Sequence, residues 1–140
     1  MTAPGDVLLV EDAEIHVAFT TLAFEREGLS DALRVARDGE TALRTIDDDP
    51  DHPPKLILLD LGLPRMSGFE VLQKIREHTN PTVRRTPVVV LTTSRSPGDV
   101  RKAYELYANS FVSKPVELDD FVALIGEVRT WWLNRVELPA

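Results

Sequence analysis

The chain of 140 residues contains no cysteine, and this absence excludes disulfide bonds and thiol chemistry. It also lacks any apolar run near the roughly 20 residues of a membrane span, although 43% of its residues are hydrophobic. Basic residues are too few to balance the acidic ones, and the net charge of −7 argues against direct binding to nucleic acid. The N-terminal stretch shows no signal-peptide pattern. We therefore expect a soluble, cytoplasmic protein that contacts neither membranes nor nucleic acid.

Five short apolar runs mark the strands of the expected fold. They are continuous rather than alternating, as is typical of strands that are covered on both faces of a parallel sheet. The runs span residues 7–10, 32–36, 56–59, 88–91 and 111–113. Helical patterns separate the runs, so the sequence predicts a doubly wound α/β fold with one five-stranded parallel sheet.

The helices are inferred from apolar spacing and from capping residues. The first helix is expected to bury residues at the i, i+3, i+4, i+7 spacing and to end near Gly28; these residues are Ile15, Ala18, Phe19 and Leu22. Four more helices are expected to begin near Asp38, near Ser67, after Pro97 and after Pro115. The helix after Pro97 is expected to reach Tyr107, whereas residues 47–54 and 78–86 are interpreted as loops.

Polar residues stand directly after the predicted strands. Glu11 and Asp12 follow the first run, Asp60 the third, Thr92 the fourth and Lys114 the fifth. All strands of a parallel sheet point the same way, so these side chains should gather at its carboxyl edge, where α/β folds place their sites. A lone buried aspartate would be costly, and this polar company explains why an apolar run ends in Asp60.

This set of side chains suits phosphoryl chemistry assisted by a metal. Three neighbouring carboxylates repel one another unless a cation intervenes, and Mg²⁺ binds through few protein oxygens while it keeps several waters. Mg²⁺ and Lys114 together would neutralise the three carboxylates. Asp60 is the candidate nucleophile that forms an aspartyl phosphate, and Lys114 and the Thr92 hydroxyl would hold the phosphoryl group.

Plain structural interpretations remain open beside these roles. Asp60 could cap a turn, and Glu11 or Asp12 could cap the helix that follows them. Thr93 and Ser94 are interpreted as caps or loop donors rather than as catalytic groups.

The histidines and the acidic run at 47–51 receive no functional role. His16, His52 and His78 share no spacing with each other or with an acidic base, so they are expected to be surface or helical residues without a part in phosphotransfer. The run "DDDPD" lacks the alternating ligands and glycine of a calcium loop and is interpreted as solvated.

Four motifs together resemble the receiver domains of two-component response regulators. They are "ED" at 11–12, "LLDLGLPRMSG" at 58–68, "LTTS" at 91–94 and "KP" at 114–115. The resemblance covers nearly the whole chain. It implies the flavodoxin-like fold with strand order 2-1-3-4-5, and we assign residues 1–130 to the domain and 131–140 to a C-terminal tail that extends the last helix.

The resemblance also implies a role for each site residue. Asp60 would accept a phosphoryl group from a sensor histidine kinase, and Lys114 would bind that group. Thr92 and Phe111 would move together as a switch that alters a protein-binding face. The implied Mg²⁺ ligands are Glu11, Asp12, Asp60 and the backbone carbonyl of Gly62.

A narrower resemblance points to the stand-alone regulators that partner bacterial phytochromes and tend to dimerise. It is carried by "PVVVLTTSRS", "YELYANSFVSKPVELDDF" and "WWLNRVELP". Such regulators often have Asn where this chain has Gly62. Because the backbone carbonyl is the ligand there, metal binding is expected to survive, and the phosphoryl lifetime is the property that the missing side chain would affect.

The last helix and the tail carry more apolar residues than one core-facing stripe needs. Leu124, Val128 and Trp131 form a second seam, and the adjacent Trp131 and Trp132 cannot both face one core. An exposed aromatic patch favours a protein interface, so we expect a homodimer through this surface. No output domain is expected, so the signal would pass to a protein partner.

Two other functions compete with this interpretation. A Mg²⁺-dependent phosphohydrolase with an aspartyl nucleophile usually carries a second acidic residue two positions later, where this chain has Gly62. A flavin-binding electron carrier of the same fold would need a phosphate loop after the first strand, which reads "EDAEIHV" instead. We therefore expect a regulator that catalyses only its own phosphorylation and dephosphorylation, not an enzyme.

Overall fold

The computed structural model describes residues 2–139, which form one sheet of five parallel strands. The strand order is β2-β1-β3-β4-β5, so the predicted fold class and order are confirmed. The strands are β1 (Val7–Val10), β2 (Leu33–Ala36), β3 (Leu56–Leu59), β4 (Val88–Thr92) and β5 (Ser110–Ser113). Each lies within one residue of its predicted bounds.

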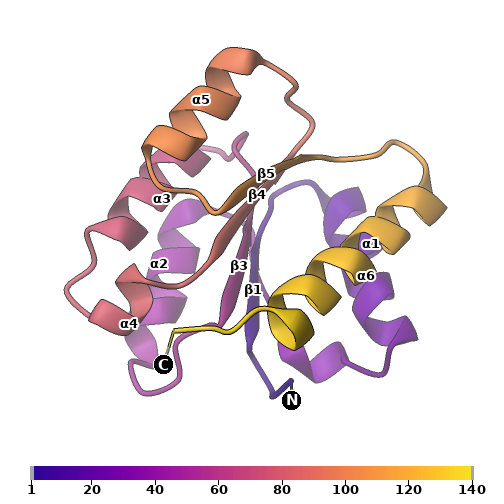
Figure 1. Ribbon diagram of the computed structural model, residues 1–140, viewed down its shortest axis with the longest axis horizontal. Coiled ribbons are helices and arrows are strands. Elements are labelled where there is room, and N and C mark those ends of the chain that lie inside the picture. The colour runs from indigo at the N-terminus through magenta and orange to yellow at the C-terminus, as the bar shows by residue number, and fades with distance from the viewer. Residues whose placement is uncertain (1, 140) are drawn as a thin grey trace.

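Helices cover both faces of the sheet (Figure 1). One face carries α1 (Glu14–Arg26) and α6 (Leu118–Thr130), and the other carries α2 (Gly39–Asp48), α3 (Gly68–Arg76), α4 (Pro81–Arg84) and α5 (Pro97–Glu105). Successive strand residues point to opposite faces. Leu8 and Val10 therefore pack on the α2–α3–α5 side, while Val7 and Leu9 pack on the α1–α6 side. β1, β3 and β4 are buried at every residue, which is why these three strands are nearly continuous apolar runs.

Four helices begin at a residue whose side chain caps the first turn. Asp38 accepts a hydrogen bond of 2.7 Å from the backbone N–H of Thr41 and so starts α2. Ser67, Asn80 and Ser96 cap α3, α4 and α5 in the same manner. The predicted starts of α2, α3 and α5 are confirmed, and a short 3-10 turn, η1 (Ser30–Ala32), precedes β2.

The predicted apolar face of the first helix is only partly right, because Phe19 packs on the core while two other residues of the stripe do not. α1 forms as expected, but Ile15 is 59% exposed and Ala18 is exposed too. The buried residues of α1 are Val17, Thr20, Ala23 and Phe24. The helix lies against both the sheet and α6, and Phe19 packs edge-on against Phe121 of α6 at 5.4 Å. The apolar stripe in the sequence thus mixes contacts to two neighbours with exposed positions.

Two loop boundaries and one helix end also differ from the predictions. The segment 78–86 contains α4, which packs into the core through the buried Val83. α2 runs to Asp48, inside the segment 47–54. α5 ends at Glu105, so Tyr107 lies beyond it, with a φ of 67° and 74% of its surface exposed. A left-handed residue such as Tyr107 cannot continue a helix.

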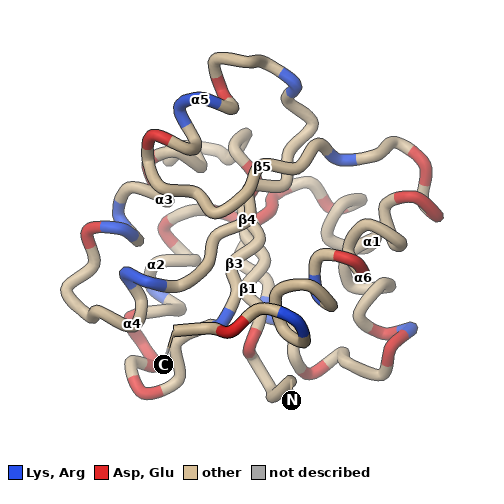
Figure 2. Tube along the Cα trace, viewed as in Figure 1, with Lys and Arg blue, Asp and Glu red and all other residues tan. Residues whose placement is uncertain are grey.

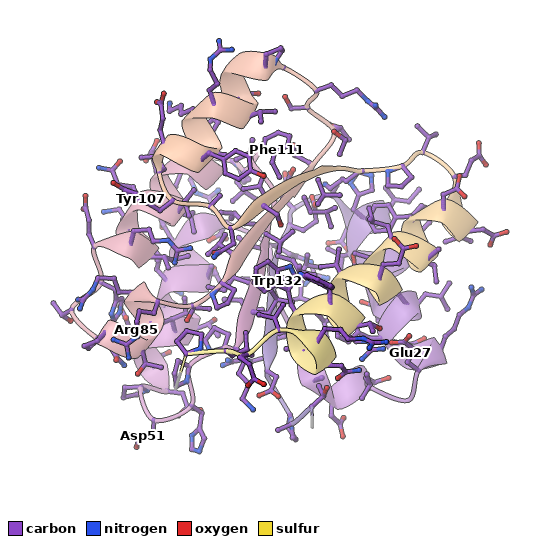
Figure 3. All side chains as sticks on the ribbon, viewed as in Figure 1. Glu27, Asp51, Arg85, Tyr107, Phe111 and Trp132 are labelled. Carbon is purple, nitrogen blue, oxygen red and sulfur yellow. The ribbon has the colours of Figure 1, made fainter. Side chains whose placement is uncertain are left out.

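α6 continues into η2 (Trp131–Arg135), a π-helical turn. Trp132 lies on this turn (Figure 3) and packs against the core cluster on the α1–α6 side. Trp131, by contrast, is 59% exposed. Leu124 and Val128 also pack partly on that cluster. Met1 and Ala140, the outer ends of the predicted domain and tail, lie outside the described residues.

Charged residues are unevenly placed on this frame (Figure 2). Acidic residues gather where α6 begins, and basic ones lie along α3 and α4. Among residues 2–139, the structure has no helix with the length and apolarity to cross a membrane.

Candidate functional site

Glu11, Asp60 and Lys114 meet at the carboxyl edge of the sheet, as the sequence predicts, and Thr92 ends the neighbouring strand β4. Glu11, Asp60 and Lys114 are only 1%, 8% and 5% exposed, and Thr92 is 3% exposed. The backbone ladder continues past the strands, because Asp60 N–H donates to Val10 O at 3.0 Å and Lys114 N–H donates to Thr92 O at 2.7 Å. These bonds fix the Cα positions from which the side chains project into one site.

A cluster of carboxylates forms the centre of this site. Glu11, Asp12 and Asp60 each offer an oxygen, and these oxygens all lie within 4.8 Å of one another. Asp12 is exposed, so the cluster opens to solvent on its side. An all-oxygen donor set that is open to water suits Mg²⁺, which keeps part of its hydration shell. The residues present therefore fit a hard divalent cation.

Lys114 is the positive charge of the site. Its Nζ donates to Glu11 Oε2 in a close ion pair and lies 3.4 Å from Asp60 Oδ1. Burial raises the pKa of the Glu11 carboxyl, with the charge of Asp60 adding to the effect and Lys114 opposing it. One ammonium faces three carboxylates, so the site holds an excess of negative charge that a bound cation would relieve.

His16 also belongs to this neighbourhood, which the sequence analysis missed. It lies on α1, as expected for a helical residue, but its Nδ1 is 3.1 Å from Lys114 Nζ and 4.0 Å from Glu11 Oε2. Burial lowers the pKa of His16, and the charge of Lys114 lowers it further. No local signal in the sequence indicates this contact, because Lys114 lies 98 residues away along the chain.

The other two histidines are not brought into the site. His52 Nδ1 lies 3.0 Å from Asp49 Oδ1, and His78 Nε2 lies 2.7 Å from Asp47 Oδ1. Both contacts are near the end of α2. The acidic run after α2 thus lies on the surface, beside histidines.

Two glycines shape the loop that follows Asp60. A Cβ on Gly68 would lie 2.3 Å from Asp60 O, so only glycine allows α3 to begin this close to the strand end. Gly68 N–H also donates to Leu61 O at 3.0 Å. Gly62 is exposed, and a Cβ there would lie 3.8 Å from Asp60 Oδ2. A side chain at residue 62 would therefore stand beside the carboxylate.

Thr92 and Phe111 lie near the site in different ways. Ser94 N–H donates to Thr92 Oγ1 at 3.4 Å, and Ser94 Oγ donates to Asp99 Oδ2 at 2.7 Å, which confirms Ser94 as a loop donor. Phe111 on β5 is half-buried and packs against the core cluster on the α5 side (Figure 3). Thr93 is exposed.

The capping alternative for the acidic pair does not describe this geometry. α1 begins with Ala13 as its N-cap residue, and no side chain caps it in the usual way. Glu11 Oε1 accepts a hydrogen bond of 3.0 Å from Ala13 N–H, while its other oxygen receives Lys114. Glu11 thus supports the start of α1 and faces the site at the same time.

The sequence matches the family model for the response regulator receiver domain over residues 7–126. The response regulator Rcp1 of Synechocystis is 36% identical over 141 residues, which cover 98% of this chain and 95% of Rcp1. The crystal structure of Mn²⁺-bound Rcp1 matches with a TM-score of 0.83 over 96% of this chain and 98% of that chain.

Two further solved structures resemble this chain closely. The phosphorylated cyanobacterial phytochrome response regulator RcpA is 31% identical, with a TM-score of 0.86 over 96% of this chain and 97% of that chain. The bacteriophytochrome response regulator RtBRR is 42% identical, with a TM-score of 0.71 over 99% of this chain and 85% of that chain.

Proposed function

The chain belongs to the response regulator receiver family and is related to phytochrome response regulators, and on this premise we propose that Asp60 accepts a phosphoryl group from a histidine kinase. One observation carries the assignment of Asp60. It is the aspartate that lies 3.4 Å from the buried Lys114 ammonium, within a three-carboxylate cluster at the carboxyl edge of the sheet. A phosphorylated relative supports the same chemistry.

The residues around Asp60 divide the work of the transfer. An Asp60 oxygen attacks phosphorus, the new O–P bond forms as the bond to the donor breaks, and the leaving group keeps its electron pair. Lys114 holds one side of the phosphoryl group, and the Thr92 hydroxyl donates to it. Mg²⁺, held by Glu11, Asp12, Asp60 and the carbonyl of Gly62, would supply charge neutralisation. The Mn²⁺-bound relative supports this ligand chemistry.

The phosphorylated state would act through the face formed by α5, β5 and α6. Thr92 ends β4 and Phe111 lies on β5, so a turn of the hydroxyl toward a phosphoryl group leaves space that the half-buried ring can enter. Such a shift changes the population of two conformations rather than building a new one. The chain turns over only its own phosphoryl group and passes the signal to a protein partner.

The phosphohydrolase alternative is not favoured. Residue 62 is Gly, and the described site holds no acid two positions after Asp60. A family of signalling receivers accounts for the same site without turnover of an external substrate.

Phosphorylation by acetyl phosphate with Mg²⁺, followed by intact mass, tests the function. We expect an adduct of one phosphoryl group that needs Mg²⁺, is labile to base and is missing from Asp60→Asn. Asp51→Asn, which removes an exposed carboxylate from the loop after α2, is the matched control. An adduct that persists in Asp60→Asn would contradict the assignment.

The kinase partner is the finer part of the proposal. Kinship with phytochrome regulators supports a bacteriophytochrome as the donor. Purified bacteriophytochrome kinase should transfer its phosphoryl group to this chain faster than a histidine kinase of unrelated input does. Equal rates from both kinases would contradict the phytochrome assignment and leave the receiver function intact.

A homodimer through α6 and η2 is the proposed assembly. Trp131 is exposed, and a groove beside it runs between α1 and α6, bordered by Ala23, Val122 and Gly126. Sedimentation at tens of micromolar should show a dimer that Trp131→Ala weakens. A monomer in the unaltered chain would contradict this assembly.

A further inference from the structure

His16 stands against the buried ammonium of Lys114, and its position is fixed from two sides. Its ring stacks on Phe121 of α6, with centroids 5.5 Å apart and planes at 13°. Phe121 is fully buried and is itself packed edge-on by Phe19 of α1. The imidazole is thus held between two helices while Nδ1 lies 3.1 Å from Lys114 Nζ.

Lys114 has two kinds of neighbour in the site. Glu11 and Asp60 are carboxylates, and both belong to the cluster that fits the divalent cation. The cation and the Lys114 ammonium compete for the lone pairs of the same carboxylate oxygens. His16 is different, because it is a neutral nitrogen acceptor, and Mg²⁺ prefers oxygen ligands. The ammonium therefore has one partner that the metal does not draw away.

We propose that His16 is a positioning residue, which holds the Lys114 ammonium beside Asp60 through Nδ1 when Glu11 serves the metal. An ammonium carries three protons and needs an acceptor for each when it is buried. With Glu11 engaged by the cation, His16 Nδ1 keeps one of them satisfied, and a second faces the phosphoryl group on Asp60. This inference rests on the proposed phosphorylation of Asp60.

The proposal fixes the tautomer of His16. To accept from an ammonium, Nδ1 must be unprotonated, so the ring is neutral with its proton on Nε2. The ring need not reach the phosphoryl group or exchange a proton with it. Its part is to keep the Lys114 ammonium beside Asp60 when Glu11 binds the cation.

Two substitutions separate the acceptor from the ring. His16→Phe keeps an aromatic ring on Phe121 and removes the acceptor. His16→Asn removes the ring and places an amide oxygen close to where Nδ1 lies. A hydrogen bond to a charged group corresponds to about tenfold in rate, so at saturating Mg²⁺ we expect His16→Phe to be phosphorylated about tenfold more slowly by acetyl phosphate. His16→Asn should regain most of that loss, although its melting temperature falls.

The rates of the variants decide whether His16 positions Lys114. Rates of His16→Phe equal to the unaltered chain, or a loss that is the same in both variants, would overturn the proposal. In a Lys114→Met background, His16→Phe should cause no further loss, and a further loss would overturn it as well. His52→Phe, on an exposed histidine, is the control.

A spectroscopic measurement separates this inference from the proposed function. Long-range ¹⁵N–¹H NMR of the His16 ring in unphosphorylated protein should show a neutral ring protonated at Nε2. A proton on Nδ1 at neutral pH would overturn the role of His16, whatever the phosphorylation data show. No adduct on the unaltered chain, with the expected tautomer present, would count against the function and not against the Lys114 contact.

Discussion

At the carboxyl ends of the strands, Glu11, Asp60 and Lys114 lie buried against one another, whereas at the amino ends buried polar groups lie against backbone. Asp6, just before β1, is 7% exposed, and its Oδ2 accepts a hydrogen bond of 2.6 Å from Ala3 N–H. Thr86, just before β4, is 3% exposed, and its hydroxyl lies 3.1 Å from Thr82 O. Both edges are polar, but only one has like charges packed together.

The difference shows that repulsion between like charges is concentrated at the carboxyl edge of the sheet. The buried polar groups of the amino edge bond to backbone atoms, which the fold holds in place. The amino edge is therefore stable without a bound ligand. At the carboxyl edge three carboxylates share one ammonium, and burial raises the pKa of Glu11. A bound cation would relieve this repulsion. We therefore expect substitutions that remove a hydrogen-bond partner to destabilise the amino edge. Substitutions that remove a carboxylate charge should be tolerated at the carboxyl edge.

Arg76 is the strongest test of the amino edge. From α3 its guanidinium donates to four acceptors around the starts of β4 and β5: Arg84 O, Thr86 O, Tyr107 O and Asn109 Oδ1. Arg76→Ala removes these four hydrogen bonds, of whose acceptors Asn109 Oδ1 keeps a bond from Val88 N–H, and should lower the free energy of unfolding by about 3 kcal/mol. Urea unfolding measures it. Lys74→Ala, at an exposed position of the same helix, should lower the free energy of unfolding by less than about 0.5 kcal/mol. An equal loss of stability in both variants would show that the amino edge does not depend on the hydrogen bonds of Arg76.

Asp6→Asn tests the same edge with a smaller change. The substitution keeps an oxygen for Ala3 N–H but removes the charge that faces Lys55 Nζ at 3.6 Å. We expect a loss of about 1.5 kcal/mol in the free energy of unfolding, because the bond to a charged acceptor is weakened in a buried position. Asp31→Asn, at an exposed position of η1, is the control, and chemical denaturation at neutral pH compares them.

The sequence carried most of the fold because its strands are buried on both faces. Residues 56–59 and 88–91 are apolar at every position, and both are strands within one residue of those bounds. The site at the strand ends follows from that geometry, since parallel strands deliver Glu11, Asp60 and Lys114 to one edge. Capping residues and proline also marked the starts of helices, as at Asp38, Ser67 and Pro97.

What the sequence could not supply depends on contacts between elements. The inward face of α1 is set by both the sheet and α6, so the stripe from Ile15 to Leu22 included the exposed Ile15 and Ala18. α4 is one turn long and is stabilised by the burial of Val83, which no periodicity reveals in four residues. His16 meets Lys114 across 98 residues of chain, a contact that no local spacing encodes.

Asp60→Asn should have the opposite sign from Asp6→Asn. In EDTA at neutral pH, the substitution removes one of three clustered carboxylates while Lys114 keeps its close pair with Glu11. We expect the free energy of unfolding to rise by about 1 kcal/mol. Saturating Mg²⁺ should shrink the gap, because the unaltered site gains more from the cation. A less stable Asp60→Asn protein in EDTA would show that the two edges do not differ in kind.

The smallest effect concerns how the stability of the carboxyl edge varies with pH. Burial raises the pKa of Glu11 above its ordinary value of 4.5, so the folded chain binds this proton more tightly than the unfolded chain does. The contribution of Glu11 to stability therefore falls as the pH rises from 4.5 through the pKa of Glu11 in the folded chain. At higher pH it stays at this lower level. Glu11→Gln removes this slope.

The urea midpoints of Glu11→Gln and the unaltered chain, both in EDTA, should thus shift in favour of the variant between pH 4.5 and 7. The variant also loses the contact with Lys114, which changes its stability by the same amount at every pH. Only the change with pH in the difference between the two midpoints reports the titration of Glu11. Glu25→Gln on the exposed side of α1 provides the matched loss of a carboxylate. A gap that shifts the other way would mean that Lys114 stabilises the Glu11 carboxylate more than burial disfavours it, and that this edge, like the amino edge, is satisfied without a cation.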